Sequence, residues 1–208
     1  MTQSVQSVVT PERFADGLTY QQFIDRLIEE EKAPRSEDEQ FRPRNVERFQ
    51  FNYDNTTVPE EEAKALRALV ARENGPKKML VLGEFWCPDV YRGLPVLARI
   101  AEASGMELRV FPRDENLDIM NEFLKDGEFQ SIPTAVFYTK DHDYLLHWIE
   151  RPRKANDEMP LMRKLYEGRT REEAAPDVAK FQEGPVWAGW RDATVTEIRE
   201  LLEEKVGR

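Results

Sequence analysis

The sequence predicts an α/β fold with a central mixed sheet of about four strands and helices on its faces. Met79 to Phe85 is a short, nearly continuous apolar run, which is typical of a strand covered on both faces. Helix and strand patterns alternate after it and end in two consecutive strand patterns, Thr134 to Thr139 and Tyr144 to Ile149. Helical patterns before and after this unit predict N- and C-terminal helical extensions.

Two helices are expected before the first strand. Apolar residues recur at three- and four-residue spacing from Tyr20, and Thr19 with Gln22 has the sequence of a capping box at the start of this helix. A second helix starts near Pro59, because proline suits the first helical turn, and ends at Asn74-Gly75-Pro76.

The stretch from Glu29 to Arg48 is highly charged and is interrupted by two prolines, so we expect an extended connector over the surface. The sequence thus divides into an N-terminal helix and connector (1–58), an α/β core (59–152) and a C-terminal helical extension that packs on the core (153–208).

Within the core, a helix from Pro88 to about Ser104 separates the first strand from a second at Glu107 to Phe111. A strand, helix and strand in this order predict a right-handed parallel crossover. A short helix follows, which Asp114 or Asn116 caps. The loop Lys140 to Asp143 is short enough to join the last two strands as an antiparallel hairpin.

The C-terminal extension contains a helix around Leu161 to Leu165. Thr194 and Glu197 have the spacing of a capping box and predict the start of the last helix. Gly184 to Trp190, between these helices, is expected to be a loop that two tryptophans pin to the core.

The composition excludes several classes of partner. The 208 residues include 40 acidic and 30 basic side chains, which gives a net charge of −10 and a sequence pI near 4.9. This charge disfavours nucleic acids and anionic membranes as partners. No apolar stretch approaches the ~20 residues of a membrane span, and no secretory signal is visible at the N-terminus. We therefore expect a cytoplasmic protein; its oligomeric state is not predicted.

Three motifs resemble those of thioredoxins. Phe85-Trp86-Cys87-Pro88-Asp89-Val90 resembles the Trp-Cys-x-x-Cys turn, and it lies between a buried strand and a helix N-terminus as in that family. Ser131-Ile132-Pro133-Thr134 resembles the cis-proline loop, and Pro95 resembles the proline that kinks the helix after the cysteines. The resemblance covers about Lys77 to Pro152 and implies a thioredoxin-like fold. It also implies that Cys87 is the catalytic residue and that the site is completed by Trp86, Pro88, Asp89, Val90, Ile132 and Pro133.

The chain departs from thioredoxins where they carry the second, resolving cysteine. Val90 stands at this place, and Cys87 is the only cysteine. A dithiol enzyme needs one thiol to attack a substrate disulfide and another to break the mixed disulfide that results. Cycling as a dithiol is therefore excluded. Val90 shares a helix face with Leu94 and Leu97, so we expect it to extend the core; a natural and an engineered exchange would look alike.

Cys87 is the main candidate for chemistry. A helix N-terminus favours a negative group, so we expect a lowered thiol pKa. Asp89 would oppose the thiolate, and Arg92 would partly offset that effect. In this interpretation, Cys87 forms mixed disulfides with a protein thiol or glutathione, an external thiol resolves them, and no bound cofactor or metal is needed. A reactive thiol and an inert one both remain open.

The main alternative is a non-redox binding module. Pro133, if cis, exposes the backbone of Ile132 and gives an extended peptide an edge to pair with. A glutathione-transferase-like enzyme is a weaker third interpretation, because a long all-helical C-terminal domain is not evident.

Other polar residues are assigned structural roles. His142 and His147 have opposite strand parity, so we expect them on different faces and predict no metal site. Glu84 is expected at a solvated strand end rather than in a proton relay. The basic residues between Arg151 and Lys154 are expected in a solvated loop, with phosphate binding as the alternative.

Overall fold

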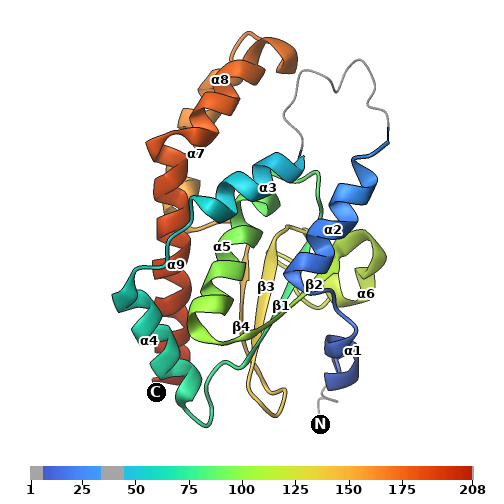
Figure 1. The fold of residues 1–208 in the computed structure, drawn as a ribbon, viewed down its shortest axis with the longest axis vertical. Helices are drawn as coiled ribbons and strands as arrows, with labels where there is room; N and C mark the ends of the chain where they lie inside the picture. The colour runs from blue at the N-terminus through green and yellow to red at the C-terminus, as the bar shows by residue number, and fades with distance from the viewer. Residues whose placement is uncertain (1–6, 34–44, 208) are drawn as a thin grey trace.

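The computed structural model describes residues 7–33 and 45–207. Its four-stranded mixed sheet has the order β2-β1-β3-β4 (Figure 1). The strands are β1 (Lys78–Gly83), β2 (Glu107–Pro112), β3 (Thr134–Tyr138) and β4 (Tyr144–Ile149). β1 is parallel to β2 and antiparallel to β3, and β3 is antiparallel to β4. The predicted α/β fold with a mixed sheet of four strands is confirmed.

The centre of the sheet is apolar on both faces, as the unbroken run in β1 predicted. Val81 pairs with Val110 of β2 on one side and with Ala135 of β3 on the other, and all three are fully buried. Helix α5 (Pro88–Ser104) connects β1 to β2, and Gly105 ends it with a φ of 82°. A left-handed residue at this place suits glycine, which has no β-carbon to clash.

Within the described ranges, four helices precede the sheet: α1 (Pro11–Ala15), α2 (Tyr20–Glu30), α3 (Asn45–Asp54) and α4 (Glu60–Ala71). α2 begins with the predicted capping box. The connector predicted over residues 29–48 is wrong at both ends, because α2 reaches Glu30 and α3 begins at Asn45; residues 34–44 lie outside the described residues.

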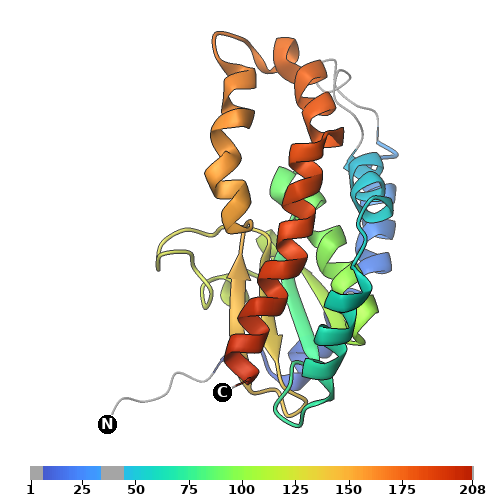
Figure 2. The ribbon, with the colours of Figure 1, turned by 90° about the vertical axis from the view of Figure 1, so that its left-hand side faces the viewer.

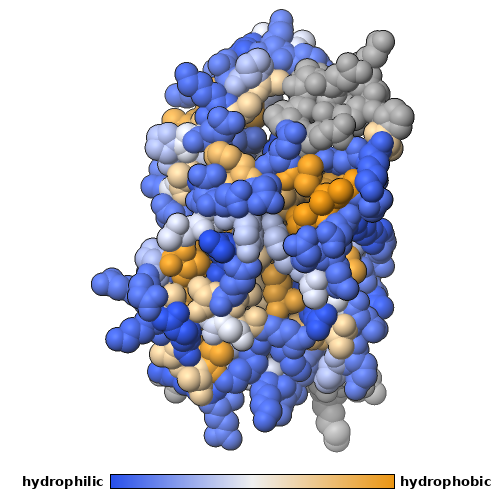
Figure 3. Space-filling view, viewed as in Figure 1, coloured by the Kyte–Doolittle hydropathy of each residue, from blue (hydrophilic) through white to orange (hydrophobic). Residues whose placement is uncertain are grey.

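Tertiary contacts explain why α3 forms in a stretch with little periodicity. Phe49 is fully buried and packs edge-on against Phe23 of α2 and Tyr91 of α5. Figure 3 shows that the face carrying these helices is largely hydrophilic, with an apolar patch over α2 and α3.

After β2 the chain forms η2 (Arg113–Glu115) and α6 (Leu117–Met120), and after β4 it forms α7 (Arg153–Arg163), η3 (Lys164–Tyr166), α8 (Arg171–Glu183) and α9 (Pro185–Val206). Figure 2 shows α7 leading away from the sheet and the chain returning through α8 and the long α9. α9 packs on α4, α5 and β4, so the C-terminal extension shares one hydrophobic core with the sheet.

The loop predicted at residues 184–190 is wrong. α9 begins at Pro185, and Trp187 and Trp190 are buried along its side against Phe181. The capping box predicted at Thr194 is also wrong, because Thr194 lies inside α9 and its Oγ1 donates to the carbonyl of Trp190. Glu197 instead accepts a hydrogen bond from Trp148 Nε1 of β4 at 2.9 Å.

In the part of the chain that the structure describes, no helix has both the length and the apolar character needed to cross a bilayer.

Candidate functional site

Cys87 is the N-cap residue of α5. Its φ of −84° and ψ of 124° are extended, Pro88 takes the first helical position, and the Cys87 carbonyl accepts the N–H groups of Val90 and Tyr91 at 3.0 and 3.1 Å. The thiol thus lies at the positive end of a 17-residue helix, where unpaired N–H groups favour negative charge.

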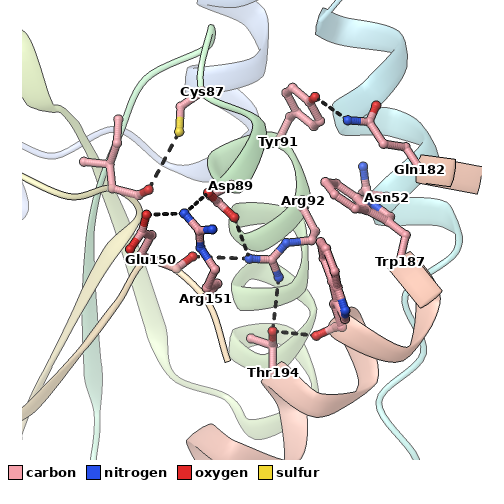
Figure 4. A network of polar contacts seen from close by, with 12 residues as sticks. Asn52, Cys87, Asp89, Tyr91, Arg92, Glu150, Arg151, Gln182, Trp187 and Thr194 are labelled. Carbon is pink, nitrogen blue, oxygen red and sulfur yellow. Dashed lines mark hydrogen bonds and ion pairs between the residues drawn. The ribbon is translucent and has the colours of Figure 1, made fainter. Parts of the chain in front are cut away.

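The loop before β3 meets this thiol. The Ile132–Pro133 peptide bond is cis, and Cys87 Sγ lies 3.7 Å from the carbonyl oxygen of Ile132 (Figure 4). On the other side of the cysteine, Trp86 is 57% exposed, with the Arg113 guanidinium 5.3 Å from its ring centre. The structure therefore places the half-buried Cys87 sulfur against Ile132, with the exposed Trp86 directly before Cys87 in the chain.

Asp89 connects the thiol to a cluster of buried charges. Its carboxylate lies 3.2 Å from Arg92 Nη2 and 2.8 Å from Arg151 Nη2 (Figure 4). Arg92 is fully buried and also donates to the Glu150 carbonyl at 3.2 Å and to Thr194 Oγ1 at 3.4 Å. The cluster therefore joins α5 to the end of β4 and to α9.

Glu150 closes this cluster toward solvent. Its carboxylate pairs with Arg151 and with Lys125, whose Nζ lies 2.5 Å away. These cations hold the pKa of Glu150 below its ordinary value despite the opposing effect of burial. The prediction that Arg151 lies in a solvated loop is wrong. Its side chain pairs with Asp89 and Glu150 and is only 16% exposed.

The sequence predicts a lowered pKa for the Cys87 thiol, and this prediction is wrong. Burial raises the pKa of Cys87, and the charge of Asp89 raises it further. The N–H groups of Val90 and Asp89 and the charge of Arg151 act in the opposite direction but do not prevail. The free thiol is therefore protonated at neutral pH, although groups that would stabilise a thiolate surround it.

The sequence matches the family described as Thioredoxin over residues 35–167. The chain belongs to the thioredoxin family. Two solved structures share its fold: a protein of unknown function from Pseudomonas aeruginosa has a TM-score of 0.60 at 17% identity, covering 94% of this chain and 98% of that one. An HIV epitope-scaffold has a TM-score of 0.57 at 19% identity, covering 96% and 99%. None of the curated proteins matches the chain.

Val90 is a packing residue in this thioredoxin-family protein. It is fully buried, as are Leu94 and Leu97 on the same face of α5. Gly83, at the end of β1, faces it so closely that a β-carbon there would lie 2.9 Å from Val90 Cγ1. The branched side chain thus fills the space under the turn that carries Cys87.

Glu84 lies between β1 and this turn and is not the solvated residue we predicted. Only 9% of it is exposed, and its carboxylate accepts the N–H of Asp114 at 2.8 Å. Burial raises its pKa. Its contact fixes the start of the segment that follows β2.

Strand parity predicted that the two histidines point to different faces, and this prediction is wrong. His142 lies in the turn before β4, with a φ of 71°, so its side chain does not follow the alternation of that strand. Both histidines line one cavity. Among the described residues, no group of three His, Cys, Asp or Glu is placed to hold a metal ion.

Proposed function

We propose that this thioredoxin-family protein acts through a single thiol, as a thiol–disulfide oxidoreductase that forms a mixed disulfide between Cys87 and a partner protein or glutathione. The observation that carries this proposal is the position of Sγ, 3.7 Å from the Ile132 carbonyl at the N-terminus of α5. A partner segment that pairs with the backbone before Pro133 would bring its own sulfur to Cys87. Trp86, exposed on the other side, would contact such a segment.

The proposed step conserves electrons and protons. Cys87 loses its proton and attacks one sulfur of a disulfide, a new S–S bond forms, and the other sulfur leaves as a thiolate that takes up a proton. Val90 offers no second thiol, so an external thiol of the glutathione class must attack the mixed disulfide and restore Cys87. This requirement suits the cytosol, where that thiol pool is reduced.

The raised thiol pKa determines when this step is fast. Only a small fraction of the free protein carries a thiolate at neutral pH, so small disulfides react slowly with it. A bound partner raises the local concentration of its disulfide and compensates for this small fraction. We therefore propose that the partner segment first binds along a groove beside Pro133, at the backbone edge of Ile132, and that the reaction follows.

The same raised pKa favours one alternative, a binding module without redox chemistry. In that case the groove beside Pro133 would hold an extended segment through the backbone of Ile132, and the thiol would be a small packing group.

Intact mass after incubation with oxidised glutathione tests the proposal. We expect one glutathionyl adduct on the folded protein, none on Cys87→Ser, and loss of the adduct when reduced glutathione is added. The chain unfolded in urea is the control for an intrinsically competent thiol. An adduct that forms only on the unfolded chain would contradict the proposal and favour the binding module.

A further inference from the structure

A cavity of about 710 Å³ lies at the end of β3 remote from Pro133. It opens between the β3–β4 hairpin, the segment after α6 and the N-terminal segment before α1. Its walls are largely aromatic: Phe123, Tyr138, Tyr144 and the two imidazoles of His142 and His147. None of these residues contributes to the thiol site described above.

The register of the hairpin gathers these rings. The pairing of β3 with β4 shifts between Phe137 and Tyr138, so Tyr138 lies opposite Tyr144. His147 pairs with Val136, two residues from Tyr138, so both tyrosines and His147 belong to one face of the sheet. Phe123 stacks on Tyr144 from the segment after α6, with ring centres 6.3 Å apart.

Two buried polar atoms of the cavity walls have no hydrogen-bond partner among the residues that the structure describes. Tyr138 is only 2% exposed, and its hydroxyl is unpaired. His142 stacks on the Tyr138 ring at 4.4 Å, and its Nε2 lies 2.9 Å from the carbonyl oxygen of Val9. A carbonyl only accepts, so Nε2 carries the proton, and burial lowers the pKa of His142 and keeps the ring neutral. Nδ1 is therefore an acceptor without a donor.

The cavity is also acidic. Glu122 lines it, and among the described residues its carboxylate accepts from two neutral donors, Ser7 Oγ and the N–H of Val8, each at 2.6 Å. Asp143 lines it as well and accepts a hydrogen bond from the hydroxyl of Thr139 at 3.3 Å. No lysine or arginine belongs to the cavity walls formed by the described residues. Lys78, next to the wall, acts on His142 through its charge but does not line the cavity. Two carboxylates among the lining residues, beside aromatic faces, favour a cation.

We propose that this cavity binds an organic ammonium ion, a protonated primary amine with an aromatic or apolar body. Its N–H groups supply the donors that His142 Nδ1 and the Tyr138 oxygen lack, and the side chains of the wall must shift for this contact, because both atoms are buried in the free protein. Its charge faces Glu122 and Asp143, and its apolar body contacts Phe123 and Tyr144. A neutral isostere lacks the charge, and an anion is repelled, so the site discriminates by charge as well as by shape.

Titration of the full chain with 2-phenylethylammonium, followed by amide chemical shifts, tests this site. The matched probes are 2-phenylethanol, which is neutral, and phenylacetate, which is an anion. We expect saturable binding of the amine, with shifts centred on residues 138–147 and 122–123, and binding at least about tenfold weaker for the alcohol. Absence of saturation up to about 10 mM amine, or equal affinity for the alcohol, would overturn the proposal.

Tyr138→Phe distinguishes a binding role from a structural one. Because the hydroxyl has no partner in the free protein, its removal should leave the melting temperature unchanged or higher and should weaken amine binding about fivefold. Tyr91→Phe is the control. Tyr91 does not line the cavity, and its Oη accepts a hydrogen bond of 2.8 Å from Gln182 Nε2. This control should lower the melting temperature without changing the affinity. Unchanged affinity in Tyr138→Phe would contradict the assignment.

Discussion

The carboxylate of Asp89 lies 2.8 Å from Nη2 of Arg151, and this ion pair joins the turn that carries Cys87 to the chain that leaves β4. Arg92 holds the same carboxylate from within α5 and continues the contact to Thr194 of α9. Contacts with the C-terminal extension therefore hold the turn that carries Cys87 in place. A charge in this cluster acts both on the fold and on the thiol.

Asp89→Asn tests the effect of this charge on Cys87. The carboxylate raises the thiol pKa, so its removal should move the midpoint of Cys87 alkylation to lower pH and speed the reaction at pH 7.5. Asp157→Asn, which removes an exposed carboxylate on α7, should leave the midpoint unchanged. A midpoint that stays in place or rises in Asp89→Asn would refute this electrostatic coupling.

Arg92→Met tests the contribution of the buried guanidinium to stability. The variant leaves Asp89 with one cation fewer and the carbonyl of Glu150 without this donor, so we expect a loss of about 3–5 kcal/mol in the free energy of unfolding. Arg99→Met on the same helix removes an exposed pair with Glu102, a hydrogen bond to the Thr56 carbonyl and a contact with the Tyr53 ring. Because Arg99 is partly exposed, this loss should cost only about 1 kcal/mol. Urea denaturation of both variants measures the difference, and equal losses would rule out a special role for Arg92.

The sequence predicted the sheet better than it predicted the helices packed on it. The positions of the first strand and of the terminal hairpin follow from local signals, namely the apolar run at Met79 and the short loop after Thr139. α3 and the first turns of α9 escaped prediction because they are fixed by contacts with distant segments. Phe49 packs on Tyr91, and Trp187 Nε1 donates to Asn52 Oδ1 at 2.9 Å. No local spacing encodes such contacts.

Gly83→Ala tests the close packing under the turn. The added β-carbon would lie 2.9 Å from Val90 Cγ1, so we expect a loss of about 1–3 kcal/mol in stability. The same change in a Val90→Ala background should cost much less, because the clashing methyl is gone. A double-mutant cycle by urea denaturation measures this coupling, and strictly additive losses would show that the two residues do not meet.

Val90→Cys tests whether the missing thiol alone prevents dithiol chemistry. We expect a loss of about 1 kcal/mol from the smaller side chain, together with the appearance of dithiothreitol-dependent reduction of insulin disulfides. Val90→Ser is the control for the altered packing and should remain inactive. If Val90→Cys is folded but inactive, features other than residue 90 separate this site from a dithiol enzyme.

Part of the site was visible in the sequence and part was not. The motifs around Cys87 and Pro133 identified the residues that meet at the sulfur, because each motif belongs to a local turn. The pairing of Arg151 with Asp89 depends on where β4 ends relative to α5, which the sequence does not show. The sign of the thiol pKa shift was mispredicted for a similar reason, since burial depends on the whole fold.

The rate of Cys87 alkylation by iodoacetamide against pH tests most directly the claim that the thiol is available in the groove but held protonated by burial. We expect the folded protein to react completely, with a midpoint above the ~8.5 of an ordinary thiol, and the unfolded chain to show the ordinary midpoint. A midpoint well below ~8.5 in the folded protein would contradict the raised pKa, and no reaction of the folded protein at any pH would contradict access to the groove.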